Sequence, residues 1–271
     1  MSAVSSNPSP MSELPAASGT RRARITAVTS GKGGVGKTFV SANLAAALVR
    51  RGEKVLVLDA DLGLANLDVV LNLFPKITLH DVFTGKHKLE EAVMAAPGGF
   101  HVLLAGSGMV EYSRLTPEVR DQLVDVIQQM RPRFDRILLD TGAGISDVVL
   151  YTVSLADEVL VVATPEPTSL TDAYATIKVL ATTQGRRDLK LLVNQVTQTG
   201  EGRTIRGQLQ QVVDRYVTPS LEAPLKLEFV GEIPVDAAVR DAVRRRQLML
   251  ECFPGSAAAQ AVLAVATRLT S

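Results

Sequence analysis

The sequence predicts a single α/β domain in which a central, mostly parallel sheet carries helices on both faces. The first observation is that short apolar runs, which are typical of buried strands, alternate with segments of helical periodicity. The second is that Asp or Asn follows several of these runs, at the strand ends where open α/β sheets bind ligands. The third is the length of 271 residues, which suits one large domain that folds alone.

The first 20 residues differ in composition from the rest of the chain. They are rich in Ser, Pro and Ala and contain few large apolar side chains, a composition that does not support a packed core. We therefore expect a disordered tail over residues 1–20 and the folded domain over residues 21–271.

A glycine-rich loop lies between an apolar run, residues 25–28, and a helical pattern with Leu44 and Leu48 on one face. Its pattern, G-x-x-x-x-G-K-[ST], is typical of a phosphate-binding P-loop. Backbone N–H groups and the helix N-terminus favour phosphate oxygens there. The lysine would reach the β- and γ-phosphates, and the threonine hydroxyl would bind Mg²⁺. The loop consists of Gly31, Lys32, Gly33, Gly34, Val35, Gly36, Lys37 and Thr38.

An acidic segment follows the second apolar run, residues 54–58, and contains Asp59, Asp61 and Asp68. At this end of a buried strand, carboxylates belong to the ligand-binding edge of the sheet. A turn with a helix-capping carboxylate is the alternative, and it stays open for Asp68. The pattern of residues 76–96 then predicts short helices and turns.

Asp140 ends another apolar run, residues 137–139, and gives a Walker B pattern downstream of the P-loop. In this position it would hold Mg²⁺ through water. Residues 141–146 match a switch II segment, whose backbone N–H groups sense a γ-phosphate. A further strand at residues 158–163 leads into P-E-P-T-S-L-T-D-A-Y, where the next helix is expected to be capped by Thr168, Ser169 or Thr171.

The strand predicted at residues 189–193 ends at Asn194. The N-K-x-D box of GTPases is absent, because the sequence continues Gln-Val-Thr and lacks the Asp that accepts from the guanine edge. The last predicted strand, residues 225–231, precedes the sequence I-P-V-D, which includes Pro234 and Asp236.

The loop K-G-G-V-G-K-T resembles the deviant Walker A box of the MinD/ParA ATPases, and D-x-D-x-G-x-x-N-L-D resembles their switch I segment. D-T-G-A-G-I-S followed by P-E-P-T-S-L-T-D-A-Y resembles the FlhG/FleN branch of that family, over about residues 25–245. The resemblance implies that Lys32 crosses a dimer interface to the partner's nucleotide. It also implies that Asp61 positions the attacking water and helps to hold the Mg²⁺ hydration shell.

The same resemblance implies how the nucleotide base is bound. Asn194 would contact adenine, and the loop with Pro234 and Asp236 would line the base pocket. Phe39 departs from the family pattern, because many relatives have a hydroxyl residue there, and Phe39 offers a phosphate only its backbone N–H.

For function, the resemblance implies slow hydrolysis of ATP to ADP with Mg²⁺, coupled to a monomer–dimer switch that controls flagellar number, placement and gene expression. The implied partners are a second copy with ATP, the signal-recognition-type GTPase FlhF and a FleQ-type transcription activator. Residues 1–24 lack the D-Q-A box by which many relatives engage FlhF. The alternative function is positioning of a cell-division site or a chromosome, as in MinD and ParA.

Composition excludes several other classes. A formal charge of +1 argues against direct DNA binding over the whole surface. One cysteine, Cys252, excludes an intramolecular disulfide and fits a reducing cytoplasm. The final segment, residues 256–270, is alanine rich with one Arg, which favours packing on the domain over membrane binding. We expect a cytoplasmic protein, with peripheral association at the inner membrane or cell pole as the open alternative.

Overall fold

The computed structural model describes residues 14–17, 22–62, 66–106 and 114–270. Within these residues the predicted α/β fold is confirmed: one eight-stranded sheet has the order β3-β4-β2-β5-β1-β6-β7-β8. Every neighbouring pair is parallel except β3 and β4. The strands are β1 Arg24–Ser30, β2 Val55–Ala60, β3 Val93–Ala95, β4 His101–Leu103, β5 Arg136–Ala143, β6 Glu158–Ala163, β7 Asp188–Val196 and β8 Lys226–Pro234.

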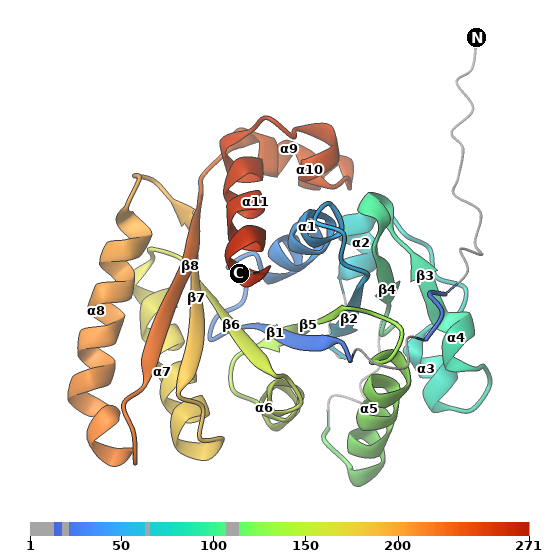
Figure 1. Ribbon diagram of the computed structural model, residues 1–271, viewed down its shortest axis with the longest axis horizontal. Helices are drawn as coiled ribbons and strands as arrows, with labels where there is room; N and C mark the ends of the chain where they lie inside the picture. Colours follow the sequence, from blue (N-terminus) through green and yellow to red (C-terminus); the bar gives the residue numbers. More distant parts are fainter. Residues whose placement is uncertain (1–13, 18–21, 63–65, 107–113, 271) are drawn as a thin grey trace.

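Helices cover both faces of this sheet, as Figure 1 shows. One face carries α1, α2, α9, α10 and α11, and the other carries α5, α6, α7 and α8. The helices are α1 Lys37–Val49, α2 Leu67–Leu71, α3 Leu79–Phe83, α4 Leu89–Ala92, α5 Pro117–Met130, α6 Asp147–Ser154, α7 Pro167–Thr183, α8 Glu201–Tyr216, α9 Ala237–Arg245, α10 Met249–Cys252 and α11 Ala257–Thr270.

The strands are buried on both sides because each sheet face packs on its own helices. In β2, Leu56 and Leu58 face one core cluster, whereas Val55 and Val57 face the other. This alternation follows from the two-residue period of a strand. The central position of β1 places the loop that follows it in the middle of the carboxyl edge of the sheet.

Helix α11 packs on the domain, as predicted for the final segment. Its apolar stripe, which includes Val262, Val265 and Leu269, is buried in the cluster that also contains α1. Arg268 donates to the Val230 carbonyl of β8 at 2.8 Å, and the buried Arg136 donates to the Leu269 carbonyl at 3.2 Å. Burial and hydrogen bonds therefore both hold α11 against the sheet.

Three local features differ from the sequence-based expectations. An antiparallel edge strand, β3, occupies part of the segment that we expected to contain only helices and turns. Helix α7 begins at Pro167 with Glu166 as its N-cap residue, so none of the expected hydroxyls caps it: Thr168, Ser169 and Thr171 lie inside its first two turns. Leu14 of the expected tail packs against the core. The other parts of that tail, residues 1–13 and 18–20, and residues 63–65 of the acidic segment lie outside the described residues.

Candidate functional site

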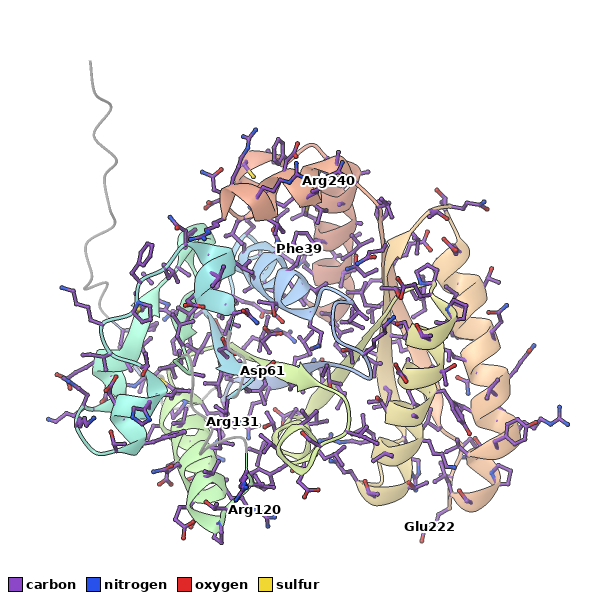
Figure 2. All side chains as sticks on the ribbon, turned by 180° about the vertical axis from the view of Figure 1, so that it is seen from behind. Phe39, Asp61, Arg120, Arg131, Glu222 and Arg240 are labelled. Atoms are coloured by element: carbon purple, nitrogen blue, oxygen red, sulfur yellow. The ribbon has the colours of Figure 1, made fainter. Side chains whose placement is uncertain are left out.

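The candidate site is a cleft of about 690 Å³ at the carboxyl ends of β1, β2 and β5. It brings together seven residues predicted from the sequence with residues of the segment after β5. Its lining includes Gly33, Gly34, Gly36, Lys37, Thr38, Phe39, Asp61, Leu62, Thr141, Gly142, Ser146 and Val149. Figure 2 shows Phe39, from α1, and Asp61, from the end of β2, in the central part of the domain. The cleft therefore lies at the edge where parallel sheets bind ligands.

The glycine-rich loop has a backbone that only glycine adopts without strain at two positions. Gly34 has φ of 80° and Gly36 has φ of 93°, both in the left-handed region. Helix α1 begins directly afterwards, and Gly36 is its N-cap residue without a side-chain cap. The first backbone N–H groups of α1 thus lie at the cleft with the positive end of the helix dipole, which suits a phosphate.

Asn194 fixes this loop from β7, which β6 separates from β1 in the sheet. Its Nδ2 donates to the Val35 carbonyl at 2.8 Å, and its Oδ1 accepts from the Gln195 N–H at 2.9 Å. A Cβ on Gly36 would lie 2.5 Å from the same Nδ2, so a side chain there would displace Asn194. Asn194 therefore acts on the P-loop backbone in this structure, and its contact with adenine stays a prediction.

Lys37 reaches into the cleft floor. Its Nζ donates to the Ser30 Oγ at 3.0 Å, and the Ser30 hydroxyl donates to the Lys32 carbonyl at 2.7 Å. Burial lowers the pKa of Lys37, whereas the carboxylates of Asp140 and Asp61 act in the opposite direction. The ammonium group of Lys37 thus lies near the carboxylates of Asp140 and Asp61. A bound phosphate would attract the ammonium group away from them.

Asp140 is buried at the end of β5 and accepts hydrogen bonds from two hydroxyls of α1. Ser41 Oγ donates to Asp140 Oδ1 at 2.9 Å, and Thr38 donates to the same carboxylate. Burial raises the pKa of Asp140 to about 6, although both hydroxyls and the Lys37 charge oppose this shift. The sequence predicted Asp140 and Thr38 for this position but not Ser41.

Asp59 lies beside the cleft without lining it, and no individual role was predicted for it from the sequence. It stands opposite Asp140 in the β2–β5 register, and it is almost fully buried. Its oxygens accept from the Asp61 N–H at 3.2 Å and the Leu67 N–H at 3.4 Å. Burial raises the pKa of Asp59 well above the ordinary range, and the Asp140 charge adds to this shift. Its position as the first acidic residue directly after an apolar run was the available signal.

Asp61 lies one residue beyond β2 and faces the segment after Asp140. A Cβ on Gly142 would lie 3.4 Å from the Asp61 carboxyl carbon, so the carboxylate is next to the predicted switch II backbone. Hydroxyl and carboxylate oxygens from Thr38, Asp61 and Asp140 thus converge beside a phosphate-type glycine loop. Oxygen ligands of this kind suit Mg²⁺ with a nucleotide phosphate, so these residues fit the ion that the sequence predicted.

Lys32 points away from this cleft. Its Nζ donates to Glu166 Oε2 at 2.6 Å and to Thr168 Oγ1 at 2.8 Å, at the start of α7. The preceding Gly31 lies so close to the Asp172 carbonyl of α7 that any Cβ would collide with it. The side chains of Lys32 and Glu166 are 36% and 61% exposed, so the ion pair is at the surface.

Pro234 and Asp236 lie at the end of β8, apart from the phosphate side of the cleft. Asp236 Oδ1 accepts from the Ala238 N–H of α9 at 2.9 Å, and Oδ2 accepts from the Ala258 N–H of α11 at 3.1 Å. Both carboxylate oxygens therefore cap helices. A role for this loop in lining a base pocket stays a prediction.

Comparison with known proteins agrees with this geometry. The sequence model of the ParA family, described as "NUBPL iron-transfer P-loop NTPase", matches residues 21–270. The antiactivator FleN of Pseudomonas aeruginosa is 43% identical over 92% of this chain and 86% of its own. The flagellum site-determining protein YlxH of Helicobacter pylori is 34% identical over 92% of this chain and 82% of its own. MinD of Pyrococcus horikoshii, solved with Mg-ADP, has a TM-score of 0.71 and 28% identity over 91% of this chain and 96% of its own.

The fold and the glycine-rich cleft define a P-loop nucleotide hydrolase of the α/β class. Within that class, the chain belongs to the ParA/MinD family and to its FlhG/FleN branch. It is an ATPase, and ATP or ADP with Mg²⁺ are the ligands of this family.

Proposed function

We propose that this ATPase is a dimerising switch: ATP joins two copies, and slow hydrolysis separates them. The observation that carries the proposal is the direction of Lys32. Although Lys32 lies in the phosphate loop, its Nζ is bound to Glu166 and Thr168 on the molecular surface. A P-loop lysine with this orientation is available to the nucleotide of a second copy once the ion pair opens.

Slow turnover by a single copy follows from the same geometry. Transfer of a γ-phosphate requires cations placed where negative charge develops. In one copy, Lys37 and an Mg²⁺ ion held by Thr38, Asp61 and Asp140 would supply this positive charge, and Lys32 does not line the cleft. Addition of the partner's Lys32 would complete the site, so hydrolysis would depend on assembly. A surface ion pair is worth only about 0–1 kcal/mol, so contacts in a dimer are sufficient to replace it.

The biological process is inferred from the relatives. FleN is named as an antiactivator, and YlxH is named for determining flagellar sites. We infer that this chain likewise regulates flagellar number, placement and gene expression. Its partners would be a flagellar GTPase of the FlhF type and a transcription activator of the FleQ type.

Positioning of a division site or a chromosome is the alternative, and the likeness to MinD supports it. A chromosome-positioning protein requires a DNA-binding surface, which the near-neutral charge does not favour. We therefore expect no direct DNA binding, and filter binding with a salt titration would detect it. In the described part of the chain, no helix has the length and apolar character needed to cross a membrane. We propose a cytoplasmic location, and peripheral association at the inner membrane or cell pole is the alternative.

The decisive experiment is sizing by light scattering with ADP and with ATP. The expected result is a monomer with ADP and a dimer with ATP, while Lys32→Ala binds ATP but stays monomeric. Lys54→Ala, which changes a lysine just before β2, is the matched control and should dimerise normally. If wild type does not dimerise with ATP, or if Lys32→Ala dimerises as wild type does, the switch is the wrong description.

A further inference from the structure

Ser41 occupies an unusual place for a polar residue. It lies in α1 within a buried run from Phe39 to Leu48, and its exposed fraction is 0%. A buried hydroxyl without a partner destabilises the folded state. Serine inside a helix commonly satisfies its hydroxyl with the carbonyl four residues earlier. Ser41 instead donates across to β5, 99 positions along the chain, where Asp140 Oδ1 accepts at 2.9 Å.

Helix geometry explains why Ser41 meets Asp140. Residues three and four apart lie on the same face of a helix, so Ser41 shares the face of Thr38 and Lys37. All three side chains act on Asp140: the two hydroxyls by hydrogen bonds and Lys37 by its charge. The carboxylate is 2% exposed, so protein groups and not bulk water determine its orientation.

The two hydroxyls differ in what they do when the nucleotide is present. Thr38 is the P-loop residue whose hydroxyl is expected to bind Mg²⁺, so its hydrogen bond with Asp140 changes when the ion arrives. Ser41 lies one turn further into α1 and does not line the cleft. It remains free to hold Asp140 throughout the cycle. Partners that orient a metal-binding carboxylate in this way typically contribute 10–100-fold to metal affinity.

We propose that Ser41 is a positioning residue of the Mg²⁺ site, which holds the carboxylate of Asp140 in the orientation that serves the ion. The proposal concerns ion binding in a single copy. It therefore does not depend on dimerisation or on any flagellar role, and the failure of either would leave its test unaffected.

The test measures Mg²⁺ dependence separately from nucleotide affinity. A fluorescent ADP analogue is titrated with EDTA present, and then the Mg²⁺ concentration for half-maximal response is measured at saturating analogue. For Ser41→Ala, we expect the half-maximal Mg²⁺ concentration to rise about 10-fold, with the affinity in EDTA unchanged. Ser41→Thr keeps the hydroxyl and should have the wild-type half-maximal Mg²⁺ concentration.

Thr176→Val is the matched control, because Thr176 is also a buried helical hydroxyl but bonds within its own helix, to the Asp172 carbonyl. It should leave the Mg²⁺ dependence unchanged. The proposal is overturned if Ser41→Ala needs no more Mg²⁺ than wild type. Equal losses with and without Mg²⁺ also overturn it, because they indicate a purely structural role. If Ser41→Ala fails to fold, Ser41→Cys has a similar shape and a weaker donor, and a wild-type Mg²⁺ response in it would refute the proposal.

Discussion

Replacement of Asp140 by Asn should stabilise the ligand-free protein at alkaline pH. The pKa of Asp140 is about 6, whereas a solvated Asp has 3.8, and this difference of about two units corresponds to roughly 3 kcal/mol. Because the folded-state pKa is raised, the stabilising contribution of the protonated carboxyl is complete below about pH 4. It is lost as the pH rises through about 6. At pH 8 the wild-type protein therefore holds a charge that burial disfavours.

The asparagine side chain removes that charge, but it also weakens a hydrogen bond. It offers one acceptor oxygen where the carboxylate offers two, so the hydroxyl of Thr38 or Ser41 loses a strong acceptor, at about 1–2 kcal/mol. The expected net gain at pH 8 is about 1–2 kcal/mol, or roughly 3–6 °C in melting temperature for a domain of this size. Near pH 4, where Asp140 is protonated, the gain should disappear.

The assay is thermal melting of Asp140→Asn and wild type in EDTA between pH 4 and pH 8, repeated with excess Mg-ADP. Asp188→Asn removes an exposed carboxylate at the start of β7 and serves as the control. With Mg-ADP the order should reverse, because the variant lacks the carboxylate that we expect to hold the ion. A variant that melts below wild type at pH 8 in EDTA would refute the argument, as would a gap that does not change with pH.

The remaining predictions concern the nucleotide cycle. Lys37→Ala should weaken ATP binding at least 10-fold in equilibrium titrations, because the P-loop pattern predicts that Lys37 reaches the β- and γ-phosphates; near-normal affinity would contradict this. Asp61→Ala should bind ATP and dimerise but release phosphate at least 10-fold more slowly, and it should stay dimeric after excess ATP is removed; a monomer with ATP would contradict this. ATP should compete better than GTP, because the guanine-reading Asp is absent after Asn194, and equal affinity would exclude adenine recognition. Deletion of residues 1–20 should leave ATP-dependent dimerisation intact. Loss of the Leu14 contact should lower the melting temperature by only a few degrees, and a larger drop would show that the tail packs extensively.

The central part of the site was predictable because it depends on local sequence. The P-loop pattern, the apolar run before it and the helix after it are contiguous, and the two residues that they single out, Lys37 and Thr38, both line the cleft. Asp140 was predictable for a similar reason, since one strand and its last residue carry the signal. Each of these predictions needed only the period of one element and the rule that ligands bind at the carboxyl edge.

The features that were missed depend on contacts between distant segments. Nothing near Ser41 in the sequence indicates a bond with Asp140, because the bond requires the packing of α1 on β5. Asp59 was left unassigned because its burial opposite Asp140 depends on the register of two strands. Strand β3 has three residues, too few for a periodic pattern to distinguish a strand from a turn.

The shared cap at Asp236 has a consequence for the design of reporter proteins. One carboxylate caps the N-terminal ends of two helices, α9 and α11, so a change at α11 reaches the loop after β8 directly through this side chain. A fluorescent fusion or truncation that displaces α11 would leave one oxygen of Asp236 without its donor and loosen the loop predicted to border the base. Nucleotide affinity measured on such a fusion would report the tag as well as the protein, and an internal label on the exposed face of α8 avoids this error.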